Sequence, residues 1–308
     1  MFIPYARQSI SDQDIAAVSE VLRSDFLTQG PAIPNFETAL ATYCGAKHAV
    51  AVNSATSALH IACLALGVGP GDIVWTNPIS FVASANCALY CGAKVDFVDI
   101  DPDTFNISIA ALTAKLERAK KSGSLPRVVI PVHLAGQSSD MAAIHALAQD
   151  YGFKIIEDAS HAVGGTYNGS PVGSCLYSDI TVLSFHPVKI ITSGEGGMAL
   201  TNSASLSAAM ERLRSHGITR DKNLFQHASD GPWYYEQVDL GFNYRLTDIA
   251  AALGLSQFQR LDSFVARRNE IARDYDSLFL GSIFTTPTIH NDVISAFHLY
   301  VIRMAFTG

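Results

Sequence analysis

Lys189 occupies a position where a lysine needs an explanation, because it lies between an apolar segment and a glycine-bearing turn in "LSFHPVKIITSGEGG" (residues 183–197). Most loop lysines are solvated surface charges, since an ammonium group is rarely buried without a partner. A lysine can also act as a covalent catalyst that forms a Schiff base with a carbonyl compound. The choice depends on whether the other groups needed for such chemistry are present.

Small hydroxyl residues mark a second candidate site in "VNSATSALHIA" (residues 52–62), where a strand pattern gives way to a helix pattern. Ser54, Thr56 and Ser57 lie at this transition, and the free backbone N–H groups at the start of a helix favour an anion such as a phosphate. Ordinary capping of the helix by Ser or Thr explains the same residues. Alone, this stretch therefore leaves both explanations open.

Asp158 follows an apolar run in "FKIIEDASHA", so we expect it at the carboxyl end of a strand, where open α/β sheets place their ligands. A buried carboxylate there needs a positive partner. The plain explanations are a helix cap or a structural ion pair, and the functional partner would be the protonated nitrogen of a heterocycle. His161 is either a core histidine or a donor to a phenolic oxygen. Phe81 follows another strand pattern and is either a core aromatic or a surface on which a ring stacks.

Together these groups form the set that pyridoxal phosphate requires. The set comprises a phosphate site, an acid for the pyridine nitrogen, a ring stack and a Schiff-base lysine. Ser184, shortly before Lys189, adds a further hydroxyl. Each group has a plain structural explanation by itself, so the prediction of this cofactor depends on their occurring together.

The elements that must position these residues alternate between short apolar runs and amphipathic helix patterns, which is typical of βαβ units with a mostly parallel sheet. The predicted strands are "HAVAVNS", "DIVWTNP", "KVDFVDID", "RVVIPVHLAG", "FKIIEDASH", "ITVLSFH" and "GGMALTN". An N-terminal helix in residues 11–24 has a Ser/Asp cap and places Ile15, Val18 and Leu22 on one face.

Further helices are predicted in residues 55–67 and 138–152, the second with a Ser cap and a terminal glycine. Residues 247–279 keep apolar residues at three and four spacing, which predicts one long helix or two abutting ones. The segment "SAFHLYVIRMAF" (residues 295–306) predicts an alternating strand.

The length of 308 residues exceeds what one compact core normally supports. We therefore expect a large domain in residues 1–246, including an N-terminal arm, and a smaller one that begins with the linking helix in residues 247–308. The formal net charge of −7 and the near absence of Lys/Arg clusters argue against a nucleic-acid partner.

The sequence also predicts a cytoplasmic protein without a membrane segment. The N-terminus lacks a basic region followed by an apolar one, and no apolar run approaches the ~20 residues of a membrane span. Five cysteines without a C-x-x-C pair fit neither a disulfide framework nor a zinc site, so we expect them in the core and expect no metal.

Three segments, "EDASHA", "SFHPVKIITSGEGGMALTN" and "GFNYRLTDIAAALGLSQ", closely resemble the DegT/DnrJ/EryC1/StrS family of sugar aminotransferases. The resemblance covers essentially the whole chain in the family's order. It implies an α/β fold, the fold-type I scaffold of PLP-dependent transferases, with a mostly parallel sheet, flanking helices and a smaller C-terminal domain. Family members continue for several elements past the "HLYVIRM" segment, so we expect that domain to be incomplete here.

The resemblance also implies residue roles. Lys189 would form the Schiff base and move protons, Asp158 would pair with the pyridine nitrogen, His161 would lie near the phenolic oxygen, and Phe81 would stack on the ring. The residues expected around the phosphate are Ala55, Thr56, Ser57 and Ser184 of one subunit and Asn243 of the other subunit of a homodimer. A lysine at position 189 favours transamination, because the deoxygenating branch of the family has histidine there.

The substrate implied by the resemblance is a nucleotide-linked sugar. The segments "RSHGITRDKN", "PWYYEQVDLGFNYRLTD" and "SAFHLYVIRM" are most similar to members that act in pseudaminic acid synthesis. Such members transfer an amino group from glutamate to C4 of a UDP-linked 4-keto-6-deoxy-N-acetyl hexosamine. Two alternatives stay open: another nucleotide sugar, 3-keto or dTDP-linked, and a truncated cofactor-binding module without turnover.

Overall fold

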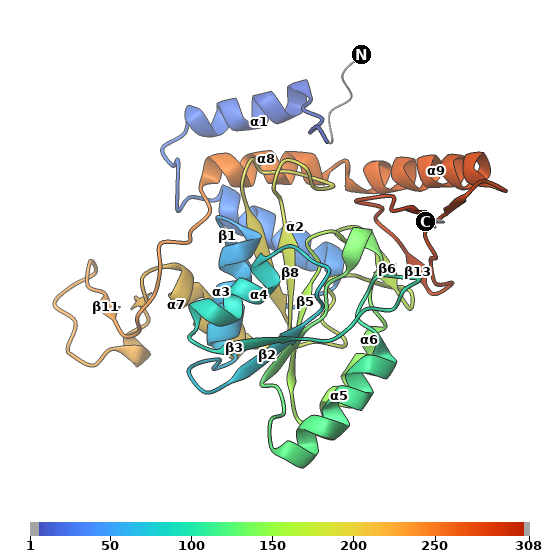
Figure 1. The fold of residues 1–308 in the computed structure, drawn as a ribbon. Helices are drawn as coiled ribbons and strands as arrows, with labels where there is room; N and C mark the ends of the chain where they lie inside the picture. Colours follow the sequence, from blue (N-terminus) through green and yellow to red (C-terminus); the bar gives the residue numbers. More distant parts are fainter. Residues whose placement is uncertain (1–5, 305–308) are drawn as a thin grey trace.

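The central element of the molecule is a seven-stranded sheet with the order β1-β9-β8-β5-β4-β2-β3 (Figure 1). It is seen in a computed structural model that describes residues 6–304. The strands are β1 (His48–Val52), β2 (Ile73–Thr76), β3 (Lys94–Phe97), β4 (Val128–Ile130), β5 (Lys154–Asp158), β8 (Ile180–Ser184) and β9 (Gly197–Thr201). Each of these strands lies within one of the segments predicted from the sequence.

The sheet is mostly parallel, as predicted, with β9 as the exception. The four neighbouring pairs from β8 to β3 are parallel, whereas β9 is antiparallel to both β8 and β1. A parallel return needs a crossover, usually a helix. The segment between Ser184 and Gly197 contains the Lys189 loop and no helix, so the chain turns back beside β8 in the opposite direction.

Helices cover both faces of the sheet (Figure 1). They are α1 (Asp12–Leu22), α2 (Ala32–Cys44), α3 (Ala55–Ala65), α4 (Ala83–Tyr90), α5 (Ile109–Ser122), α6 (Met141–Tyr151), α7 (Ala204–Arg214), α8 (Asp248–Phe258) and α9 (Leu261–Phe279). One face packs against α3, α4 and α7, and the other packs against α2 and α8 at one end and α5 and α6 at the other.

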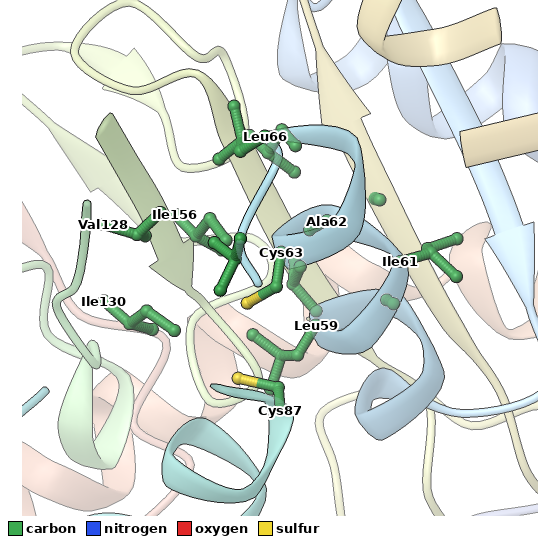
Figure 2. Packing of buried hydrophobic residues seen from close by; sticks show 14 of the residues in the cluster. Leu59, Ile61, Ala62, Cys63, Leu66, Cys87, Val128, Ile130 and Ile156 are labelled. Atoms are coloured by element: carbon green, nitrogen blue, oxygen red, sulfur yellow. The ribbon is translucent and has the colours of Figure 1, made fainter. Parts of the chain in front are cut away.

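Alternate residues of the strands supply the two faces of this core. Ile130 and Ile156 point toward Leu59 and Cys63 of α3 (Figure 2). Val129 and Ile155, their neighbours in sequence, pack in the cluster that contains α5 and α6. All five cysteines are free and buried, so the expectation that they belong to the core is confirmed.

Short strand pairs lie outside the main sheet. Two of them form two-stranded sheets, β10 with β11 and β12 with β14, and β13 joins β6 and β7 in a three-stranded sheet. Their bounds are Thr166–Tyr167 (β6), Ser170–Pro171 (β7), Ile218–Thr219 (β10), Glu236–Gln237 (β11), Phe284–Thr285 (β12), Val293–Ile294 (β13) and Arg303–Met304 (β14). The segment that carries β11 projects away from the sheet (Figure 1).

The N-terminal helix is held by a polar contact. Ser11 caps α1 as predicted, but Asp14 is the fully buried residue of this helix, and its carboxylate accepts hydrogen bonds from Ser256 Oγ at 2.6 Å and Gln257 Nε2 at 2.7 Å. The face that carries Ile15 is instead exposed. The arm is therefore docked on α8 through a buried carboxylate.

Two local predictions were wrong. The cap of α6 is Asp140, whose side chain accepts from Ala143 N at 3.2 Å, and not a serine. The alternating strand predicted for residues 295–306 is limited to β14 among the described residues, and positions 305 and 306 lie outside them. The reason is that Ala296 N bonds to Gly136 O at 3.0 Å, so this backbone pairs with a loop and not with a strand.

The region from 247 to 279 contains two helices, α8 and α9, which run nearly end to end (Figure 1). The predicted domain boundary after residue 246 falls just before α8, and the division into two domains stays a prediction. Within residues 6–304 no helix is both long enough and apolar enough to cross a membrane.

Candidate active site

A cavity of about 830 Å³ opens at the carboxyl ends of β5 and β8. Eight of the nine predicted cofactor residues line it: Ala55, Thr56, Ser57, Phe81, Asp158, His161, Ser184 and Lys189. The ninth, Asn243, is exposed and does not line the cavity. The fold thus brings together side chains from the α3 terminus, the turn before α4, and the ends of two strands.

Asp158 is buried at the end of β5 and is fixed by three hydrogen bonds. Its Oδ2 accepts from Ser84 Oγ at 2.6 Å, and its Oδ1 accepts from Ser160 Oγ at 2.6 Å and from Ser160 N at 3.2 Å. Among residues 6–304 no ion pair within 4.0 Å involves this carboxylate. A structural ion pair is therefore not its role, and a buried carboxylate without a cation is suited to a positively charged ligand atom.

Lys189 is half-buried in the loop that follows β8, where its backbone N–H donates to His186 O at 2.9 Å. Burial lowers the pKa of its ammonium group, while the charge of Asp158 opposes that change. A lysine with a lowered pKa has more of the neutral amine, which is the nucleophilic form. The solvated surface charge considered from the sequence is thus excluded.

The start of α3 forms a site for an anion. Ser54 is the N-cap, and its hydroxyl accepts from Ser57 N at 3.1 Å, so the capping explanation is correct for this residue. The backbone N–H groups of Ala55 and Thr56 donate no hydrogen bond within the described part of the chain, and both residues line the cavity. Free N–H groups at the positive end of a helix are the usual ligands of a phosphate.

Phe81 lies in the turn that precedes α4, and its side chain is 68% exposed. This value excludes the core role that was open at the level of the sequence. An aromatic face exposed in a cavity offers a surface for an offset-stacked ring.

The cavity is lined or supported by three residues that sequence reasoning missed. Ser84 and Ser160 hold Asp158, and His298 lies against His161 with ring centroids 4.3 Å apart. Ser84 had a signal, because it follows a strand pattern within the same segment as Phe81. His298 had none, because the segment around it was assigned to a strand.

His161 is neutral at neutral pH. Burial lowers its pKa to about 4, and the charge of Lys189 acts in the same direction while Asp158 opposes it. Its Nδ1 accepts from Ala135 N at 3.3 Å, which leaves the proton of the neutral ring on Nε2. Nε2 can therefore donate to an oxygen of a ligand.

The sequence pattern of the DegT/DnrJ/EryC1/StrS aminotransferase family matches residues 8–307. The chain belongs to this family. A UDP-4-amino-4,6-dideoxy-N-acetyl-beta-L-altrosamine transaminase from Campylobacter jejuni is 42% identical over 303 residues, which are 98% of this chain and 76% of that relative. The spore coat polysaccharide biosynthesis protein SpsC of Bacillus subtilis is 42% identical over 306 residues, which are 98% of this chain and 76% of that protein.

Solved structures agree with this assignment. PseC of Helicobacter pylori, an aminotransferase involved in the biosynthesis of pseudoaminic acid, has a TM-score of 0.88 and 34% identity, covering 99% of this chain and 78% of its own. The PLP form of the sugar aminotransferase Spr1654 from Streptococcus pneumoniae has a TM-score of 0.86 and 32% identity, with coverage of 99% and 78%. The predicted fold, an α/β scaffold of PLP-dependent transferases, is thereby confirmed.

Enzymes of this family are PLP-dependent aminotransferases, and the residues of the cavity fit this cofactor. Asp158 is a buried carboxylate without a cation, and the N–H groups at the start of α3 are free. Lys189 and the exposed ring of Phe81 line the same cavity. The prediction of pyridoxal phosphate from the sequence is confirmed at the level of the family.

The last glycine of "GEGG", Gly197, has a steric reason at this site. A Cβ on Gly197 would lie 2.4 Å from Ala55 N and 2.5 Å from Ser54 C, closer than side-chain atoms approach a backbone. β9 thus begins directly against the first turn of α3. Because Gly197 has no side chain, the start of α3 can lie close to β9 and present its N–H groups to the cavity.

Gly197→Ala is expected to weaken cofactor binding by about tenfold or more. The added Cβ would overpack the contact with α3 at a cost of about 1–3 kcal/mol, and the start of α3 would be displaced to relieve it. The dissociation constant for pyridoxal phosphate, measured by fluorescence titration of the apo-protein, checks this. Gly69→Ala is the matched control, since a Cβ there meets no atom within 4 Å. Equal affinities for the two variants would contradict the proposed steric role of Gly197.

Proposed function

We propose that this chain is a nucleotide-sugar aminotransferase that moves an amino group from glutamate to C4 of a UDP-linked 4-keto-6-deoxy-N-acetyl hexosamine, as in pseudaminic acid synthesis. The observation that carries the reaction class is the placement of Lys189 and Asp158 on one cavity beside a free helix terminus. The sugar is supported by the similarity to the Campylobacter jejuni and Helicobacter pylori relatives.

In this proposal the residues of the cavity have separate roles in binding the cofactor and in the reaction. The bound cofactor supplies an electron sink for the carbanion at the carbon that loses its proton. Asp158 keeps the ring nitrogen protonated, and His161 donates to the phenolic oxygen. Phe81 would contact the ring face, and the first residues of α3 together with Ser184 would hold the phosphate.

Lys189 carries out the proton transfer. Its lowered pKa increases the fraction of free amine, which is the form that a general base requires. With cofactor and amino donor bound, the Lys189 amine would take the proton from the α-carbon of the donor and would deliver it to the cofactor.

The amino acceptor can be tested directly by mass spectrometry. Incubation with glutamate and a panel of UDP-, dTDP- and GDP-linked 4-keto sugars and a 3-keto sugar should give the aminated product fastest with the UDP-linked N-acetylated ketone. The panel is needed because a GDP-perosamine synthase from Caulobacter vibrioides is also 40% identical over 277 residues. Preference for a GDP-, dTDP- or 3-keto sugar would contradict the proposed substrate.

We further propose that the active form is a homodimer in which Asn243 of one subunit completes the phosphate site of the other. Asn243 is exposed and lies outside its own subunit's cavity. Its loop is anchored to the end of β1, since Asn53 N donates to Tyr244 O at 2.8 Å. A two-fold symmetric assembly would make two equivalent sites from such an arrangement.

Asn243→Ala is expected to weaken cofactor retention by about one to two decades, the value of one charge-assisted hydrogen bond of about 1.5–3 kcal/mol. Mixing this variant with Lys189→Ala gives a sharper test. In the mixed dimer one site carries both substitutions and the other site carries neither. Activity at limiting cofactor should therefore return once the subunits exchange. No recovery despite demonstrated exchange would mean that Asn243 serves its own subunit.

A further inference from the structure

Ser84 lies beneath the candidate cofactor site in the first turn of α4, and it is completely buried. Its hydroxyl donates to Asp158 Oδ2 at 2.6 Å. We propose that Ser84 is a positioning residue that orients the Asp158 carboxylate toward the ring nitrogen of the cofactor. The inference rests on the role of Asp158 proposed above.

The Ser84 hydroxyl has two acceptors within reach and one proton to give. The carbonyl oxygen of Phe81 lies 3.3 Å away, whereas Asp158 Oδ2 lies at 2.6 Å. Hydrogen bonds to a charged acceptor are shorter and stronger than those to a neutral one. The proton therefore points to the carboxylate.

Ser84 is also the contact that orients the carboxylate relative to a separate element. The other oxygen, Oδ1, is held by Ser160, which is only two residues from Asp158 and moves with it. Ser84 comes from a helix 74 residues earlier in the chain. A carboxylate held by its own loop alone can rotate, and a bond to α4 prevents that rotation.

The turn that carries Ser84 also carries the aromatic surface of the site. Ser84 N donates to Phe81 O at 3.2 Å, so the two residues belong to one rigid turn. The preceding loop is tied to β4, because Asn77 Oδ1 accepts from Val132 N at 3.1 Å. The same hydrogen-bonded turn thus positions both the Phe81 ring and, through Ser84, the Asp158 carboxylate.

Within the described residues, the other titratable groups near Asp158 do not bond to its carboxylate, which is held by serine hydroxyls. Lys189 and His161 share the cavity and feel its charge, but neither forms an ion pair with it within 4.0 Å. Glu157 pairs with a buried histidine on the opposite side of β5. The Cys87 thiol of α4 donates to Ser84 O at 3.3 Å and not to the carboxylate.

The test compares Ser84→Ala with Ser84→Cys, which keeps the side-chain volume but has a weak donor. In the apo-protein we expect both changes to shift the carboxyl carbon resonance of Asp158, because its hydrogen bond from Ser84 is lost or weakened. Carboxyl 13C NMR of aspartate-labelled protein measures this, with the resonance assigned through Asp158→Asn.

In the loaded enzyme kcat should fall about tenfold to hundredfold in both variants, with a smaller change in KM for glutamate. Ser207→Ala, which changes a buried serine of α7 outside the cavity, should change neither quantity.

A role in packing alone would make Ser84→Cys behave like the wild type, and that result would overturn the inference. An unchanged Asp158 carboxyl resonance and an unchanged kcat in Ser84→Ala would overturn it as well. If Asp158→Asn is inactive in that case, the proposed function of Asp158 still stands. Wild-type activity of Asp158→Asn would overturn both.

Discussion

Lys189→Ala is expected to lower kcat by about 10⁴-fold or more, the upper end of what one acid–base group contributes, because it removes both the covalent attachment and the proton carrier. The fold should persist, since Lys189 is only half-buried and its side chain forms no ion pair within the described residues. Steady-state kinetics and the thermal unfolding temperature measure the two effects.

Borohydride reduction followed by peptide mapping gives a second measurement for this lysine. The cofactor should be fixed to the peptide that contains Lys189 in the wild type and to no peptide in the variant. Lys154→Ala is the matched control, because this exposed lysine lies at the opposite end of β5, where it pairs with Asp179 at 2.9 Å. An active Lys189→Ala protein, or labelling of another lysine, would refute the assignment.

Asp158→Asn is expected to lower kcat by about 10²–10³-fold, the usual cost of removing one preorganised electrostatic group from an active site. The amide keeps the size of the side chain but removes the charge that holds the ring nitrogen protonated. It also leaves the Ser84 and Ser160 hydroxyls facing a neutral group. Single-turnover measurement of the half-reaction with glutamate isolates this effect from substrate binding.

Asp179→Asn is the control for that prediction. Asp179 accepts from Ile155 N at 2.9 Å and lies just before β8, at the end of the strand away from the cavity. Its loss should lower stability while leaving the half-reaction rate within about threefold. If both aspartate variants slowed the reaction equally, the effect would come from the sheet and not from the cofactor site.

The sequence predicted the sheet and the centre of the site because both depend on local patterns. Short apolar runs with turn residues after them defined the strands, and Asp158 and Lys189 followed two neighbouring strand ends. Parallel strands bring such ends to one edge of a sheet, so proximity in space could be inferred from position in the chain. The "GEGG" pattern could be recognised, but its steric reason required the α3 terminus to be placed against Gly197.

The parts that the sequence did not predict depend on contacts between distant segments. Ser84 and Asp158 are far apart in the chain, and no periodicity links them. His298 reached the site because its segment pairs with the loop at Ala135, where Leu299 N donates to Ala135 O at 3.2 Å, although alternation favoured a strand. Tertiary pairing outweighed the local pattern in the segment of His298.

The glutamate half-reaction tests the central claim most directly, namely that this chain is an aminotransferase with its cofactor at Lys189 and Asp158. Protein loaded with pyridoxal phosphate is incubated with excess glutamate and no sugar, and the released cofactor is identified by mass spectrometry. We predict conversion to pyridoxamine phosphate with an equal amount of 2-oxoglutarate, and none in Lys189→Ala. Fully loaded wild-type protein that leaves the cofactor unchanged would contradict the account.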